Sequence, residues 1–114
     1  MIRLLEMALD EAAWDSFSRG SAIRRAGRAG FARNICVGLG NWSAAEVAAG
    51  NWGSPEAVPV LTQALTDPEP LVRAHAAWAL GRVGSAQARA ALASRAAVES
   101  DEMVKSELAA AIES

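Results

Sequence analysis

Residues 67–81 read Asp-Pro-Glu-Pro-Leu-Val-Arg-Ala-His-Ala-Ala-Trp-Ala-Leu-Gly, and this stretch contains both a helix stop and a helix start. Two closely spaced prolines cannot continue a helical hydrogen-bond ladder, so they end the helix that is predicted to begin near Pro55. From Pro70 onward, apolar residues recur every three or four positions in two stripes, and the helix is predicted to end at Gly81 and Gly84. Because two stripes are apolar, we expect this helix to contact neighbours on two sides.

Similar helix pairs are predicted before and after this stretch. The predicted helices lie in three pairs, over residues 21–28 and 31–39, residues 55–66 and 70–83, and residues 87–98 and 102–112. In the first pair Ala29-Gly30 is the turn, and in the third pair Ala88, Leu92 and Ala96 form an inward face. Paired helices that recur at about 30 to 40 residues are typical of an α-solenoid. The sequence therefore predicts an all-α fold, a solenoid of about three helix pairs.

A short helical cap is predicted ahead of these pairs, over residues 1–20. It contains two short helices, over residues 2–9 and 11–17, with Asp10 as the N-cap of the second. Residues 21–114 then form the repeats as a single compact domain.

The connection between the first and second pairs has its own pattern. Gly-Asn-Trp occurs at residues 40–42 and again at residues 50–52. Ser43 and Glu46 have the spacing of a capping box, in which each side chain bonds the backbone amide of the other residue. We expect a separate short helix between the two copies.

The composition excludes several classes of protein. The chain has 114 residues, of which 52% are hydrophobic and 21% charged, so it can bury a core. One cysteine and one histidine cannot build a disulfide framework, a four-ligand zinc site or a cysteine-ligated iron–sulfur cluster. No apolar run approaches the roughly 20 residues of a membrane span, and charges interrupt the N-terminal segment where a signal peptide would be apolar. We expect a cytoplasmic protein with no membrane contact and no metal.

Neither the single cysteine nor the single histidine indicates a catalytic site. Cys36 lies between Ile35 and Val37 on an apolar helix, where burial would raise its pKa and leave an inert thiol. His75 lies near Leu71 and Trp78 on its predicted helix, so it is either packed or a donor on the concave surface of the repeats. We predict no catalytic residue in this chain.

The net charge is −2, but the positive charge is concentrated in one stretch. Between residues 18 and 45 there is no acid, and the arginines there are Arg19, Arg24, Arg25, Arg28 and Arg33. On a helix capped by Ser21, the guanidinium groups of Arg24, Arg25 and Arg28 share a face and repel one another unless they meet solvent or an anion. The alternatives are a solvated face or pairing with acids distant in the sequence. The missing acids favour a phosphate ligand.

Two glycines add to this prediction. Gly27 and Gly30 permit a close approach of the backbone to a ligand, and a helix that starts at Phe31 presents free amides to an anion. Arg33 lies in the first turn of that helix. The sequence therefore predicts an anion site at this helix start.

The turn between the helices of the second pair indicates a repeat family. Asp67-Pro68-Glu69-Pro70-Leu71-Val72-Arg73, followed by Ala76 and Leu80, resembles the consensus of HEAT-like repeats. Such repeats commonly keep a basic residue in each second helix, which bonds an acid and turn carbonyls of the neighbouring unit. In our alignment that position is occupied by Arg33, Arg73 and Lys105. For Arg73, this structural role is the alternative to a ligand contact.

Four strings point to a narrower family. They are Gly20-Ser21-Ala22-Ile23-x-Arg25, Gly30-Phe31-x-Arg33-Asn34, Leu39-Gly40-Asn41 and Asp67-Pro68-x-Pro70-Leu71-Val72-Arg73-x-His75-Ala76-Ala77-Trp78-Ala79-Leu80-Gly81. Together they resemble the C-terminal part of epoxyqueuosine reductase. That family reduces an epoxide on the modified base at the wobble position of tRNA, with cobalamin and two [4Fe–4S] clusters bound by domains that precede the repeats.

The resemblance implies a non-catalytic, C-terminal fragment of a longer iron–sulfur protein, because the cluster cysteines and the cobalamin-binding region do not occur in these residues. It also implies contact with the catalytic and ferredoxin-like domains and with a tRNA anticodon stem-loop. The residues that match the family motif are Ser21, Arg25, Arg33, Asn34, Asn41, Arg73 and His75. Arg24 and Arg28 are added as RNA-binding residues by the charge argument alone. The alternative function is a scaffold whose groove binds a peptide or protein domain.

Overall fold

In the computed structural model of the chain, residues 2–10, 12–14, 27–48 and 57–113 are described. The regular structure of these residues is helical, with no strand among them. The helices with assigned bounds are α1 (Ile2–Leu9), α4 (Arg28–Ala48), α5 (Ala57–Ala64), α6 (Pro70–Val83), α7 (Ala86–Ala96) and α8 (Glu102–Glu113).

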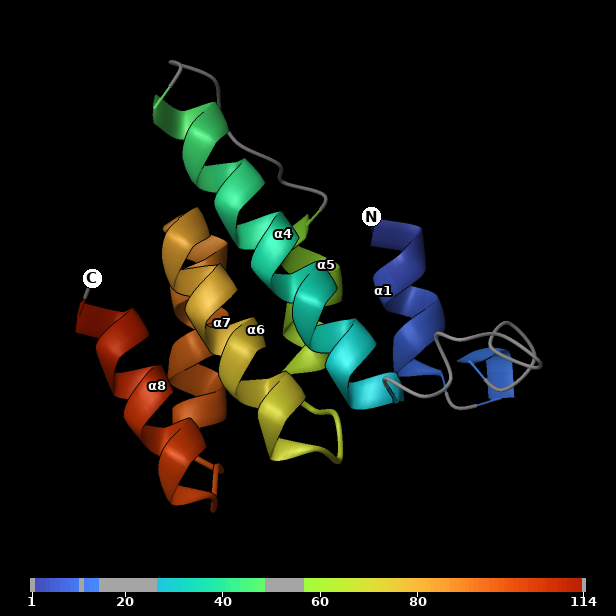
Figure 1. Cartoon of the computed structure of the whole chain (residues 1–114). Coiled ribbons are helices and arrows are strands. Elements are labelled where there is room, and N and C mark those ends of the chain that lie inside the picture. Colours follow the sequence, from blue (N-terminus) through green and yellow to red (C-terminus); the bar gives the residue numbers. More distant parts are fainter. Residues whose placement is uncertain (1, 11, 15–26, 49–56, 114) are drawn as a thin grey trace.

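The helices form two layers (Figure 1). Helices α4, α6 and α8 lie side by side in one layer, in which α6 packs against both of the others. Helices α1, α5 and α7 form the second layer, in which α5 contacts both α1 and α7. The molecule measures 41 × 34 × 17 Å, so it is a slab about two helices thick. The prediction of an all-α solenoid is confirmed.

Helix α6 lies at the centre of the fold because small residues cover two of its sides. Ala76, Ala77 and Ala79 are fully buried, as is Leu80. Large buried side chains from the other helices complete the core, and they include Leu5, Leu39, Leu61, Leu92 and Leu108. The two apolar stripes predicted for this helix are therefore both used in packing.

The ends of α6 follow the local rules of helix capping. Pro70 occupies the first turn, where its missing N–H costs nothing. Gly84 ends the helix in the left-handed conformation, with φ +68°, and its amide donates to the Leu80 carbonyl. Gly81, predicted as part of this stop, lies inside the helix. A Cβ atom there would be 2.9 Å from the Cβ of Ala111, so Gly81 allows α8 to approach α6 closely.

Helix α4 differs most from the prediction. The expected turn at Ala29-Gly30 is wrong, because both residues lie within one helix that starts at Arg28 and continues to Ala48. The change of direction occurs at Gly27, whose φ of +81° favours glycine. The separate short helix capped by Ser43 is also wrong, since Ser43 lies inside α4.

Gly40 lies inside α4 and does not end the helix. A glycine occupies this position because α4 packs very closely against α6 there. A Cβ atom at this position would lie 2.7 Å from Cζ3 of Trp78 and 3.1 Å from Cα of Ala79. The glycine therefore marks a close approach of two helices, which in a single sequence looks the same as a turn signal.

The N-cap prediction at Asp10 is confirmed. Its Oδ1 accepts hydrogen bonds from the amides of Ala12 at 3.0 Å and Ala13 at 3.1 Å. The short helical turn that follows carries Trp14, which is buried and packs on Phe31 with ring centroids 5.1 Å apart. The rest of the predicted cap lies outside the described residues.

Helix α7 is shorter than predicted. It starts after Ser85, whose hydroxyl accepts from the amide of Ala88, and it ends at Ala96. Ala88 and Leu92 are fully buried as predicted, whereas Ala96 is exposed. Eight residues turn an α-helix by about 80° beyond two full turns, which carries Ala96 away from the core face.

The close contact at Gly40 can be tested by adding a single methyl group. We expect Gly40→Ala to lower the free energy of unfolding by about 1–3 kcal/mol, because the new Cβ would force α4 away from α6. The matched control is Gly30→Ala in the same helix, where nothing lies within 4 Å of the added atom. That variant should gain up to about 1 kcal/mol from helix propensity. Urea denaturation followed by circular dichroism measures both, and equal stabilisation of the two variants would contradict the close packing.

Candidate nucleic-acid interface

The predicted RNA-binding residues divide into three groups. Ser21, Arg24 and Arg25 lie outside the described residues. On α4 the structure describes Arg28, Arg33, Asn34 and Asn41, and on α6 it describes Arg73 and His75. The layer of α4, α6 and α8 therefore carries every described candidate.

Arg28 does not face solvent, and its assignment to RNA binding is corrected. Its Nη1 donates to Oδ1 of Asp67 at 2.7 Å, and its Nη2 donates to Oδ2 at 3.0 Å. Nη1 also donates to the carbonyl of Ala8 at 3.0 Å. The two charged side chains are only 12% and 1% exposed. The sequence prediction failed because the neutralising acid lies far along the chain, outside the stretch without acids.

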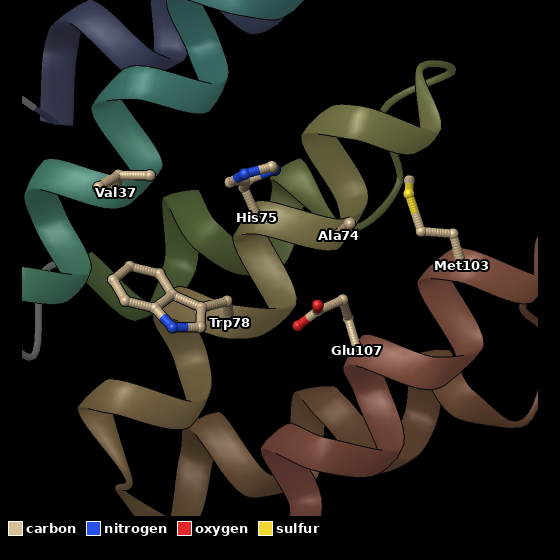
Figure 2. Close-up of a pocket in the computed structure, with 6 residues that line it drawn as sticks. All are labelled: Val37, Ala74, His75, Trp78, Met103 and Glu107. Carbon is tan, nitrogen blue, oxygen red and sulfur yellow. The ribbon is translucent and has the colours of Figure 1, made fainter.

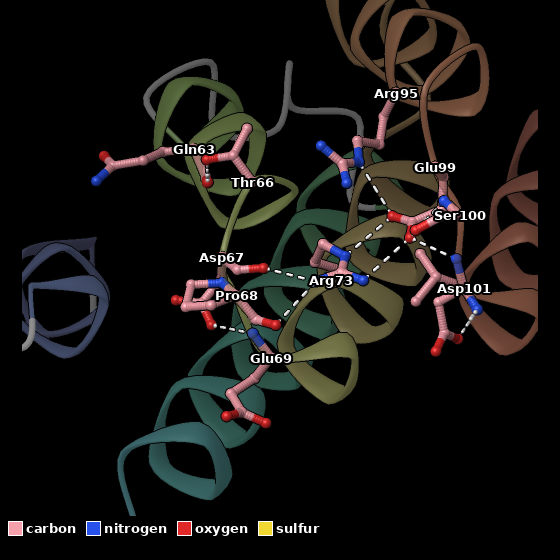
Figure 3. Close-up of polar contacts among 11 residues, drawn as sticks. Gln63, Thr66, Asp67, Pro68, Glu69, Arg73, Arg95, Glu99, Ser100 and Asp101 are labelled. Carbon is pink, nitrogen blue, oxygen red and sulfur yellow. Dashed lines mark hydrogen bonds and ion pairs between the residues drawn. The ribbon is translucent and has the colours of Figure 1, made fainter.

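Arg73 is likewise used inside the protein (Figure 3). Its Nε and Nη2 donate to the two carboxylate oxygens of Glu99, at 2.9 and 3.0 Å. Its Nη1 donates to the carbonyls of Asp67 at 2.9 Å and Pro68 at 3.1 Å. With its guanidinium buried and hydrogen-bonded in this way, Arg73 is not available to a phosphate. The structural alternative for this residue is confirmed.

Glu99 receives several donors at the turn between α7 and α8. Besides Arg73, its carboxylate accepts from Nε of Arg95 at 3.0 Å and from the amides of Ser100 and Asp101 at 3.1 and 3.0 Å. Burial by itself would raise the pKa of Glu99, but these hydrogen bonds and the charge of Arg73 outweigh it and lower the pKa to about 2. Glu99 is therefore held ionised within the fold.

Asp67 and Glu99 perform the same task in successive repeats. Each lies in the turn between the two helices of a pair, each accepts a bidentate arginine from the preceding second helix, and each bonds a turn amide. We call these two pairs, Arg28–Asp67 and Arg73–Glu99, the arginine–acid ladder. Arg28 is thus the counterpart of Arg73, and our alignment of Arg33 with Arg73 is wrong because α4 starts earlier than predicted.

The third aligned cation, Lys105, lies on α8. It contacts Glu102 on the same helix at 3.3 Å, and both side chains are well exposed. Among the described residues, the ladder therefore has no third rung of the same kind.

The anion site predicted at the start of the helix near Phe31 is also corrected. Because α4 begins at Arg28, the amide of Phe31 already donates to the carbonyl of Gly27 at 3.1 Å. Arg33 is one turn inside the helix, and its Nε donates to Oδ1 of Asn34 at 3.2 Å.

Four residues keep polar or aromatic groups at the surface of α4. Arg33 is partly exposed, Asn34 and Asn41 are exposed, and Trp42 is 44% exposed. Asn34 and Asn41 are seven residues apart, which places them on the same side of the helix about two turns apart. Among the residues that the structure describes, these four are the candidates for contact with a polynucleotide.

His75 lies at a cavity of about 300 Å³ in the same layer. The cavity is lined by residues of three helices, namely Val37, Ala74, His75, Trp78, Met103 and Glu107 (Figure 2). Sequence reasoning missed Met103 and Glu107. Their spacing of one helical turn was the available signal, but it could not show that α8 faces His75.

Cofactor ligands are not brought together by the described residues. No group of three His, Cys, Asp or Glu side chains that could hold a metal ion occurs among them. Cys36 is fully buried, and burial, followed by the charge of Asp67, raises its pKa to about 12. Cys36 is therefore a neutral, enclosed thiol, as its apolar neighbours in the sequence predict. Within the same residues, no helix is both long enough and apolar enough to cross a membrane.

Comparison with known proteins first defines the class. The family model for HEAT repeats matches residues 21–113, so the chain belongs to the HEAT repeat family. Two curated relatives are epoxyqueuosine reductases. The protein from Xanthomonas campestris pv. campestris is 39% identical over 77 residues, which are 68% of this chain and 19% of that protein. The protein from Alicycliphilus denitrificans is 41% identical over 75 residues, which are 66% of this chain and 20% of that protein.

The chain thus spans about a fifth of the length of these relatives. No solved structure gives a significant match.

The assignment of Arg28 to the ladder can be tested against Arg33. We expect Arg28→Met to lower the free energy of unfolding by about 3 kcal/mol, because it leaves the buried carboxylate of Asp67 without its guanidinium. Arg33→Met, which removes a partly exposed arginine five positions later in α4, should change it by less than about 0.5 kcal/mol. Chemical denaturation of both variants measures the difference. Similar values for the two would mean that Arg28–Asp67 does not hold the repeats together.

The pKa of Glu99 predicts how stability depends on pH. A carboxyl group whose pKa is about 2 when folded and about 4.5 when unfolded stabilises the fold at neutral pH. This contribution is lost as the pH falls from about 4.5 to about 2, because the unfolded state then binds the proton more readily. Glu99→Gln should be less stable at pH 7 and should lose less stability than the unmodified protein on acidification. The matched control is Glu102→Gln, which removes the same charge from an exposed side chain of α8 and leaves the hydrogen bonds of Glu99 intact. Parallel profiles for all three proteins would contradict the assignment.

Proposed function

We propose that this chain is the tRNA-holding repeat domain of an epoxyqueuosine reductase-like protein, with the anticodon stem-loop as its ligand. The observation that carries the proposal is the identity of about 40% to two epoxyqueuosine reductases over two-thirds of the chain. By the resemblance described above, that family acts on a modified base within tRNA. In this proposal, the repeat domain serves to bind and orient the RNA.

The surface of α4 supports this role. Arg33, Asn34 and Asn41 present hydrogen-bond donors along one helix, and Trp42 adds a partly exposed aromatic ring. Such donors fix the position of an RNA backbone without reading its sequence, and an exposed aromatic ring can stack on an unpaired base. The family motif residues Arg25 and Arg33 and the neighbouring Arg24 supply positive charge in a stretch that contains no acid.

The structure narrows the set of candidate contacts. Arg28 and Arg73 belong to the arginine–acid ladder, so they act on the RNA only by holding the repeats in position. The remaining cationic candidates are Arg24, Arg25 and Arg33, with Ser21, Asn34 and Asn41 as polar contacts. His75 lies at the cavity between α4 and α8, next to this surface.

Catalysis belongs, in this proposal, to other parts of the longer protein. Its catalytic and ferredoxin-like domains would bind the [4Fe–4S] clusters and cobalamin and would pack against the repeats. A tRNA substrate also implies a cytoplasmic location.

RNA binding can be measured with an anticodon stem-loop labelled for fluorescence anisotropy. We expect weak binding that falls at least about tenfold between about 50 mM and about 200 mM salt, because arginines displace counterions from the RNA. Arg25→Glu with Arg33→Glu should weaken binding at low salt by at least about tenfold, since two attractive contacts become repulsive.

The matched control is Arg3→Glu with Arg89→Glu, which makes the same charge change at exposed positions on α1 and α7 in the other layer. This control should bind within about twofold of the unmodified chain if the effect is local rather than global. Binding that does not respond to salt, or equal losses in both double variants, would overturn the proposed function.

A further inference from the structure

We propose that the cavity lined by α4, α6 and α8 binds an arginine side chain presented by a protein partner. This site is separate from the proposed RNA contacts on α4 and goes beyond them. The argument rests on the shape of the cavity, on its aromatic and apolar lining, and on the hydrogen-bonding groups at its wall.

The shape of the cavity follows from a small residue between larger ones. Ala74 on α6 is almost fully buried, and its short side chain lines the cavity together with larger residues of the neighbouring helices. Val37 of α4 stands on one side, and Met103 and Glu107 of α8 stand on the other (Figure 2). The resulting volume of about 300 Å³ can admit a single extended side chain.

The lining suits a flat cation. Trp78 contributes its indole ring, and Val37 and Met103 contribute apolar surface. Met103 is 50% exposed, so the cavity is open to a partner. The guanidinium carbon of Arg82, which does not line the cavity, lies 5.7 Å from the centroid of the Trp78 ring, so this ring has a cationic neighbour within the chain itself. A guanidinium binds aromatic faces in this way and keeps its donors free at its edge.

Among the described residues that line the cavity, Glu107 and His75 are the ionisable ones, and Glu107 is the acidic one. Arg82, which lies over Trp78, is not among the lining residues. The carboxylate of Glu107 points from α8 toward α6 (Figure 2). Among the residues that the structure describes, it has no ion pair and no side-chain hydrogen bond. A partly buried carboxylate beside an apolar wall attracts a cationic donor.

His75 adds a second acceptor. Its Nδ1 lies 2.9 Å from the carbonyl of Leu71. A carbonyl oxygen only accepts, so we assign the proton of the neutral imidazole to Nδ1, which leaves Nε2 as an acceptor. The cavity then offers an acceptor on α6 and a carboxylate on α8, and a guanidinium with five N–H donors can donate to groups of both kinds.

A protein segment fits these groups better than RNA does. A nucleobase could stack on Trp78, but its phosphates would approach the carboxylate of Glu107 and be repelled. An arginine on a protein brings the opposite charge. The occupant is therefore an exposed arginine of a partner protein or domain.

The test uses the full 114-residue chain and a blocked peptide, acetyl-Gly-Arg-Gly-amide. We expect a saturable NMR shift of the Trp78 indole N–H and of the Met103 methyl group. The same peptide with citrulline in place of arginine keeps the shape but not the charge, and it should bind at least about tenfold more weakly. Glu107→Gln should reduce arginine binding by a similar factor. Glu113→Gln removes the same charge from an exposed position on α8 outside the cavity, and it should leave binding within about twofold.

Three outcomes would overturn the inference. They are the absence of a saturable shift, equal affinity for the arginine and citrulline peptides, and equal losses in the two glutamine variants. Displacement of the peptide by guanosine monophosphate at comparable concentration would identify a base-binding site instead and would also overturn it. The citrulline comparison needs no variant, so a folding defect cannot obscure the result. A failure of the stem-loop RNA to bind α4 would refute the proposed function without affecting this site.

Discussion

The structure depends on two carboxylates that are buried at the turns between paired helices. The side chains of Asp67 and Glu99 are 1% and 0% exposed, and each is neutralised by an arginine from the preceding second helix. A buried ion pair contributes little net stability compared with apolar packing, but removing one partner is costly. Such pairs therefore mainly fix how one repeat is aligned on the next. Each arginine finds its acid only when one repeat is stacked correctly on the next, so the ladder links helix pairs that are far apart in the sequence.

Small residues bring the helices of the α4, α6 and α8 layer close together. Gly40 of α4 allows a close approach to Trp78 of α6, and Gly81 of α6 allows a close approach of Ala111 of α8, so three helices lie close together in one layer. Ala74, another small residue of α6, lines the cavity between the same three helices. Small residues thus contribute both to the close packing of this layer and to the lining of its cavity.

The two ends of this layer differ in chemistry. Helix α4 presents Arg33 and two asparagines, whereas the cavity beside α8 presents the carboxylate of Glu107. An RNA backbone is attracted to the first and repelled by the second. In the proposed reductase, the repeats would therefore bind RNA at one end and an arginine of a protein domain further along. This division agrees with a chain that matches about a fifth of its relatives' length and would have other domains beside it.

The sequence by itself determined the class of fold and several local features. Periodicity and prolines predicted the helices around residues 57–113, and short-range rules located the caps at Asp10 and Gly84, because those signals act within a few residues. The burial of Cys36 also followed from its apolar neighbours. Only the tertiary structure showed that Arg28 contacts Asp67, that α4 runs unbroken through Gly30 and Gly40, and that Glu107 and His75 line one cavity. The ion pair of Arg28, the close approach at Gly40 and the shared cavity all depend on residues dozens of positions apart. In a sequence, a charge or a glycine looks the same whether its partner is solvent, a ligand or another helix.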